Sequence, residues 1–172
     1  MTIVLRGLLV VLAALLVWPE LPRYRAERLL AETNARLERV LRGVEPQATA
    51  VASVRMAADA ARRAAELLPP EPRPALARSI ALVMTRRLDE AVAVLDAAIA
   101  SGERPELTIN LGRARAARGD EAGARRAYVR TAWAAPGAVG TLPAAMRASV
   151  LEEVAALEVK LRAGELKEIP TL

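Results

Sequence analysis

The sequence predicts an all-α protein in which a single N-terminal transmembrane helix precedes an α-α superhelix, a domain of helix pairs stacked in series. Composition is the first observation. Alanine and leucine supply most of an apolar fraction of 53%, whereas aromatic residues make up 2% and phenylalanine is absent. Such a composition favours closely packed helices over sheets. The second and third observations are an apolar segment at the start of the chain and the prolines and glycines that divide the remainder into helix-length pieces.

Residues 1–20 are predicted to form the membrane anchor. The segment 2–18 is apolar apart from Arg6 and ends in an unbroken apolar run of 12 residues. A helix over this segment is about 25 Å long, at the short end of what spans a bilayer. Arg6 lies near enough to one end to reach the headgroups, and Trp18 and Tyr24 lie where aromatic side chains anchor the other boundary. A cleaved signal peptide is the alternative, but no small-x-small cleavage site follows the run.

Two features of the anchor give opposite orientations. Arg23, Arg25 and Arg28 follow the apolar segment, and the positive-inside rule then places the C-terminal domain in the cytoplasm. A short N-terminal region with one arginine is instead typical of an uncleaved secretory signal, which places that domain outside the cytoplasm. We expect a single-pass protein of a bacterial-type inner (cytoplasmic) membrane. We place its repeat domain on the extracytoplasmic side, and the cytoplasmic side is the alternative.

Two long helices are predicted after the anchor. Residues 21–45 form an amphipathic connecting helix with apolar positions in steps of three and four, which are Ala26, Leu30, Thr33, Leu37, Val40 and Val44. The next helix runs from Gln47 to Leu68, and its predicted buried stripe contains Val51, Val54, Ala58, Ala61, Ala65 and Leu68. A proline-rich segment then separates these helices from the remainder of the chain.

The segment 105–136 reads as two short helices folded back on each other. Pro105 suits a first helical position, Gly119 a helix stop, and Asp120 the N-cap of the second helix. Its spacing resembles the tetratricopeptide repeat, a helix–turn–helix unit of about 34 residues. The matching residues are Leu111, Gly112, Gly119, Asp120, Ala124, Tyr128 and Pro136, whereas Arg115 and Thr131 depart from the family's usual aromatic and alanine.

A second copy of this unit covers residues 72–104. Ala91 precedes Ala124 by 33 positions, and Ser79 precedes Gly112 by the same number, so both copies place small residues where their helices cross. One repeat earlier stands a degenerate half-repeat, carried by Ala57, Ala61, Ala64 and Pro69. The resemblance implies a tetratricopeptide-like domain over residues 46–164. A capping helix over residues 141–163, with Thr141 as its N-cap, is predicted to close the stack, and residues 165–172 form a tail.

The sequence argues against an enzyme. Cysteine and histidine are absent, which excludes the usual zinc sites, a catalytic thiol and a Ser-His-Asp triad. No glycine-rich phosphate-binding motif is present. We therefore predict no cofactor, no metal and no small-molecule substrate.

The resemblance to tetratricopeptide repeats implies a partner-binding concave face lined by the first helix of each unit. The positions that it assigns to this face are Arg73, Ile80, Met84, Ile109, Asn110, Arg113 and Ala117. Asn110 and Arg113 have the donors to hold a peptide backbone or a carboxylate.

The predicted function is a membrane-anchored scaffold for protein–protein interaction, as an assembly factor or accessory subunit of a larger membrane complex. The alternative is a basic adaptor at the membrane surface that binds anionic lipid or nucleic acid through its arginines, since the net charge is +5. Of these ligands nucleic acid is disfavoured, because the arginines are interleaved with acidic residues rather than gathered in one block.

Overall fold

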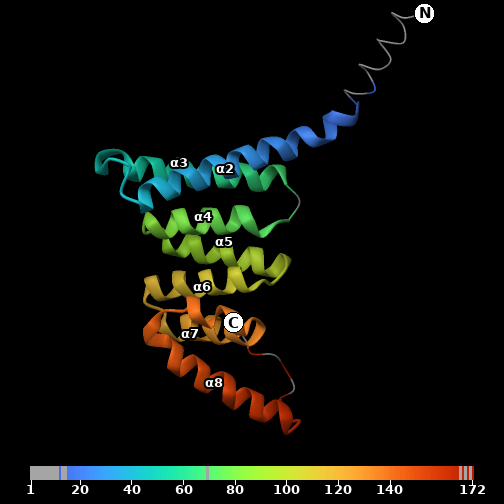
Figure 1. Cartoon of the computed structure of the whole chain (residues 1–172), viewed down its shortest axis with the longest axis vertical. Coiled ribbons are helices and arrows are strands. Elements are labelled where there is room, and N and C mark those ends of the chain that lie inside the picture. The colour runs from blue at the N-terminus through green and yellow to red at the C-terminus, as the bar shows by residue number, and fades with distance from the viewer. Residues whose placement is uncertain (1–11, 13–14, 69, 167, 169, 171) are drawn as a thin grey trace, which may run out of the picture.

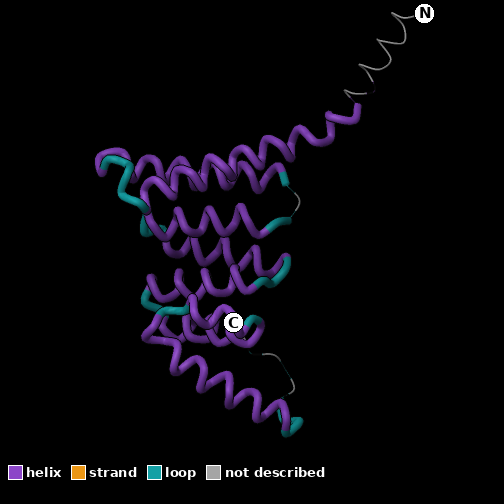
Figure 2. The backbone as a smooth tube through the Cα atoms, viewed as in Figure 1, coloured by secondary structure: helices purple, strands orange, loops and turns teal. Residues whose placement is uncertain are grey.

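The computed structural model describes residues 12, 15–68, 70–166, 168, 170 and 172 and shows helices packed in chain order (Figure 1). The elements are η1 (Trp18–Glu20), α2 (Leu21–Leu41), α3 (Gln47–Leu67), α4 (Pro72–Met84), α5 (Leu88–Ser101), α6 (Pro105–Arg118), α7 (Glu121–Ala134), η2 (Pro136–Thr141) and α8 (Ala144–Arg162). Figure 2 shows short loops between them and no strand in any described segment. The all-α prediction is confirmed.

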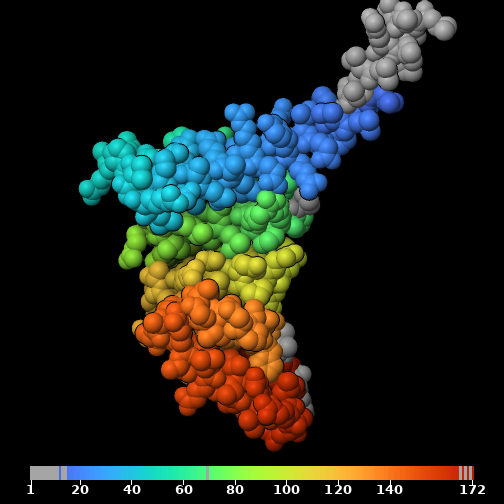
Figure 3. Space-filling view, in the orientation of Figure 1, coloured from blue at the N-terminus to red at the C-terminus, as the bar shows by residue number. Residues whose placement is uncertain are grey.

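The N-terminal end of α2 projects past the stack of the other helices (Figures 1 and 3). Within the described part of the chain, no helix combines the length and the apolar character needed to cross a bilayer. Most of the predicted anchor, residues 1–20, lies outside the described residues.

The helices form three pairs followed by α8. Helix α2 packs on α3, α4 on α5, and α6 on α7, and α8 then packs on α7. The segment 21–45, predicted as a connecting helix, therefore supplies the first helix of a complete pair. The first helices also contact one another, because α4 lies against both α2 and α6.

The same left-handed turn ends the first helix of each pair. Gly43, Arg86 and Gly119 have φ values of 68°, 61° and 89°, and the next residue's N–H bonds back to a carbonyl five residues earlier in each case. This turn satisfies carbonyl groups that the helix end would otherwise leave unpaired. Arg86 precedes Gly119 by 33 positions, so the backbone repeats at the period found in the sequence.

The pair α6–α7 begins and ends as its residues predict. Pro105 opens α6, Gly119 ends it, and the Asp120 carboxylate caps α7 by accepting a hydrogen bond from the Gly123 N–H at 2.8 Å. Gly123 has to be small, because an added Cβ would lie 2.2 Å from the Asp120 Oδ2 atom.

The buried face of α3 differs from the predicted stripe. Val51 and Ala65 are exposed, whereas Ala57, Ala60 and Ala64 are buried. The reason is that α3 packs on α2 and also on α4, so its buried face is broader than a single stripe. Val44, the last residue of the predicted seam in α2, is also exposed, because the chain turns at Gly43.

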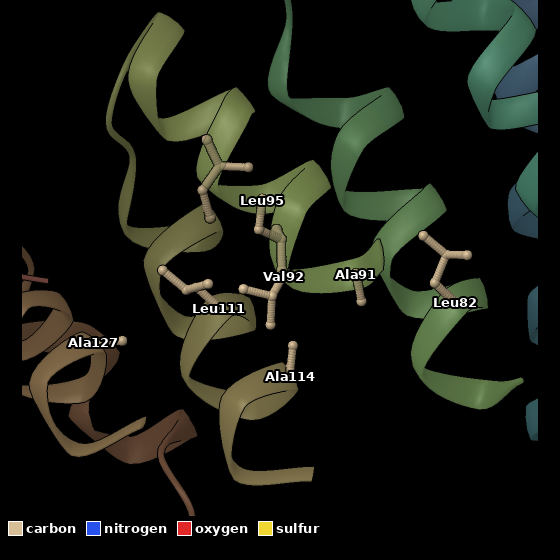
Figure 4. Packing of buried hydrophobic residues seen from close by; sticks show 8 residues of the cluster. Leu82, Ala91, Val92, Leu95, Leu111, Ala114 and Ala127 are labelled. Carbon is tan, nitrogen blue, oxygen red and sulfur yellow. The ribbon is translucent and has the colours of Figure 1, made fainter. Parts of the chain in front are cut away.

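A central hydrophobic cluster joins the second and third pairs (Figure 4). It contains Leu82 of α4, Ala91, Val92 and Leu95 of α5, Leu107, Leu111 and Ala114 of α6, and Ala127 of α7. Three of these eight residues are alanines, which allow the helices to approach closely. Leu172 packs against the same cluster, so the predicted tail returns to the stack.

The C-terminal helix starts later than predicted. Residues 136–141 form the 3-10 helix η2, and α8 begins at Ala144 after Pro143, with no side-chain cap. The Thr141 hydroxyl instead donates to the Ala138 carbonyl oxygen within η2, so its prediction as the N-cap is wrong. Val150 of α8 is fully buried against the α7 cluster, and α8 thereby covers the last pair.

Candidate functional site: the face formed by the first helices

The predicted partner-binding residues occupy two equivalent stripes on α4 and α6. Ile80 and Arg113 are 33 positions apart, and so are Met84 and Ala117. Because α4 and α6 contact each other, the two stripes belong to neighbouring first helices. We refer to the surface of α2, α4 and α6 that carries these stripes as the first-helix face.

Arg73 connects α4 to α2 at one end of this face. Its Nη1 and Nη2 atoms donate to the two carboxylate oxygens of Glu27, at 3.0 and 2.7 Å, and its Nε donates to Glu71. The hydrogen bonds from Arg73 hold the pKa of Glu27 below its usual value. Arg73 is thus engaged within the chain and ties the first two pairs together.

The polar residues of α6 also have partners within the chain. Asn110 Nδ2 donates to the Glu106 carbonyl oxygen at 2.7 Å, and Arg113 Nη2 donates to the Thr141 carbonyl oxygen at 3.1 Å. Both acceptors are backbone groups, and Arg113 remains exposed. Exchanging such a hydrogen bond for one to a ligand costs little, so both side chains remain available to a partner.

The apolar members of the predicted set differ in accessibility. Ile80 is 37% exposed, whereas Met84 and Ala117 are half-buried. Ile109 is 7% exposed and packs in the cluster with Tyr128 and Val129 of α7. Ile109 therefore stabilises the α6–α7 pair, and Ile80 offers the accessible apolar contact of this face.

The two described aromatic residues near the anchor are exposed. Trp18 is 74% and Tyr24 is 65% exposed, while Arg6 lies outside the described residues. The arginines on the first two turns of α2, Arg23, Arg25 and Arg28, are exposed and form no ion pair with another described residue.

Arginines further along α2 are neutralised by acidic neighbours. Arg36 pairs with Glu32 at 2.6 Å and Arg42 with Glu38 at 2.5 Å. The uncompensated positive charge of α2 is therefore concentrated at its N-terminal end, next to the predicted membrane segment.

One ion pair, between the buried Arg130 and the exposed Glu103, is not evident from the sequence. Arg130 of α7 is 9% exposed, and its Nε and Nη2 atoms donate to the Glu103 carboxylate at 2.5 and 2.6 Å. Its Nη1 atom donates to the Pro170 carbonyl oxygen at 3.3 Å. Arg130 holds the pKa of Glu103 below its usual value. The partners are far apart in the chain, so helical spacing gives no signal for this pair.

Among the described residues, no cluster of acidic side chains has a geometry suited to a metal ion. Comparisons with protein-family models, with curated protein sequences and with solved structures found no match.

Proposed function

We propose that the chain is a membrane-anchored, tetratricopeptide-like scaffold that holds a partner protein, as an assembly factor or accessory subunit of a larger membrane complex. The observation that carries the proposal is the serial packing of three helix pairs whose first helices contact one another. In helical-repeat proteins, stacked pairs of this kind create an extended surface for a partner.

The membrane part of the proposal rests on residues 2–18 and on the end of α2 that follows them. Exposed aromatic side chains at Trp18 and Tyr24 are typical of a membrane–water boundary. The projection of this end of α2 past the stack supports the same arrangement (Figure 1). We propose a bacterial-type inner membrane, with the repeat domain on its extracytoplasmic side.

Site-specific photo-crosslinking tests the scaffold role. A photoreactive amino acid is placed at Ile80 on the first-helix face, and at Ala100 as a control on an exposed position of α5. In cells, the Ile80 probe should give one crosslinked adduct of defined mass. The yield of this adduct should fall in the double variant N110A/R113A. The Ala100 probe should give none. If both probes leave the chain at its own mass, the first-helix face binds no partner and the proposal fails.

A second function is favoured by Arg23, Arg25 and Arg28, which have no acidic partner among the described residues. Such a cluster beside a membrane segment suits anionic headgroups, each arginine contributing about 1 kcal/mol near the surface. Co-flotation of the full chain with vesicles distinguishes the two functions. An anionic-lipid adaptor floats with anionic but not neutral vesicles, and loses binding as salt rises. An inserted anchor floats with both at any salt concentration.

A further inference from the structure

A groove lies between α3 and α5, and it is lined by none of the predicted partner-binding residues of the first-helix face. Its walls include Ala65 of α3 and Leu68, which directly follows that helix, and α5 contributes Val94 and Ala97. The N-terminal part of α4 lies between them and contributes Pro74, among other residues. The cavity has a volume of about 580 Å³, within the range of ligand sites in proteins.

The next repeat shows what covers the equivalent position. There, Arg130 of α7 bridges to Glu103, which directly follows α5, and its guanidinium also holds the Pro170 carbonyl oxygen. Leu172 packs against the central cluster. Pro170 and Leu172 of the chain's own C-terminal end thus lie on the α5–α7 side of the stack.

Sequence differences at two positions explain why the α3–α5 groove is open. The residue 33 positions before Arg130 is Ala97, and the residue 33 positions before Glu103 is Pro70. Both line the groove, and neither has a side chain able to bridge it. The ion pair that closes the space between α5 and α7 is therefore replaced by two short apolar side chains.

The charges at the rim of this groove are mainly positive. Arg78 and Arg104 line it and form no ion pair with another described residue. Glu71 lines it too, but this carboxylate is paired with Arg73. An apolar floor beneath two arginines suits a segment that carries acidic residues beside its apolar ones.

We propose that the α3–α5 groove binds an extended segment of a partner protein, which presents proline and a large aliphatic side chain next to acidic residues. The chain's own sequence at 165–172, ELKEIPTL, has this chemistry and serves as the probe. This proposal rests on the scaffold function only because it requires a partner protein. The residues that line the groove are not the predicted partner-binding residues of the first-helix face.

The test is a fluorescence-anisotropy titration of labelled ELKEIPTL peptide with the full chain in detergent. Wild-type protein should bind saturably. A97E and A93E, two substitutions at exposed lining positions, place a carboxylate beside the acidic peptide and should each weaken binding at least about tenfold. A100E, on the same helix but outside the groove, should bind as wild type. Equal helix content by circular dichroism shows that the variants fold.

Three results would overturn the proposal. They are unchanged affinity in A97E and A93E, equal binding of the peptide ELKESPTS, in which serines replace Ile169 and Leu172, and loss of binding in E103Q alone, which would place the peptide in the α5–α7 position. N110A/R113A should leave peptide binding unchanged while weakening the Ile80 crosslink. This variant therefore separates failure of the groove from failure of the proposed scaffold function.

Discussion

The Tyr128 ring packs directly on Gly112, so that a Cβ atom added to Gly112 would lie 2.4 Å from Tyr128 Cε1. Real Cβ atoms do not approach an aromatic carbon this closely, and the ring is fully buried and unable to move aside freely. This contact sets the separation of α6 and α7, the pair whose sequence most closely matches a tetratricopeptide repeat.

We predict that Gly112→Ala destabilises the protein. Alanine favours a helix over glycine by up to about 1 kcal/mol, but overpacking a buried contact costs about 1–3 kcal/mol. The clash outweighs the helix propensity, and a net loss of about 1–2 kcal/mol should appear in urea unfolding. Stability equal to wild type would show that the two helices are not held at this distance.

Tyr128→Phe is the matched control for this contact. The Tyr128 hydroxyl is buried and has no hydrogen-bond partner among the described residues, and burial raises its pKa. Removing a buried hydroxyl that has no partner costs no hydrogen bond. We therefore expect Y128F to be as stable as wild type or more stable in the same urea titration. A clear loss would reveal a partner for this group.

A second prediction concerns Arg86, which adopts the left-handed conformation that Gly119 adopts one repeat later. This conformation costs a residue with a side chain about 1–2 kcal/mol, and glycine recovers that energy but loses about 0.5–1 kcal/mol of chain entropy. Arg86→Gly should therefore raise the free energy of unfolding by about 0.5–1 kcal/mol. The reverse change, Gly119→Arg, should lower it. A loss of stability in Arg86→Gly or a gain in Gly119→Arg would contradict the shared turn.

The third prediction concerns acid stability. The hydrogen bond from the Gly123 N–H, with smaller contributions from Arg118 and Arg115, lowers the pKa of Asp120 from its usual 3.8. A lowered pKa in the folded state means that the ionised cap stabilises the protein above pH 3.8, and that this contribution disappears as the pH falls through the lowered value.

Asp120→Asn isolates this contribution, because asparagine still caps a helix but does not titrate. Wild type should be the more stable protein at pH 7, and the difference in free energy of unfolding should shrink toward zero as the pH falls through the lowered pKa of Asp120. A difference independent of pH would show that the carboxylate charge does not contribute to the cap.

Local features of the fold follow directly from the residues. The positions of Pro105, Gly119 and Asp120 define α6 and the start of α7, because prolines, glycines and N-caps act on their own backbone neighbours. The small residue at Gly112 likewise predicts the close crossing of these helices, although not that the Tyr128 ring occupies the space.

Features that depend on distant segments could not be predicted. The outward position of Val51 results from α4 packing on a second side of α3, and the pairing of Arg73 with Glu27 joins residues 46 positions apart. Ile109 is likewise predicted to lie on the accessible partner-binding face, whereas packing against α7 buries it. Helical periodicity predicts which residues of one helix share a face, but it does not predict which other helices pack on that face.

The most direct test of the central proposal is the native mass of the full-length chain. The protein is extracted from its membrane in gentle detergent, purified at physiological ionic strength and measured by native mass spectrometry. We predict a stoichiometric complex of this chain with a second protein, which dissociates to the single chain in N110A/R113A. A wild-type preparation that contains only the monomeric chain, solvated by detergent, would contradict the scaffold function.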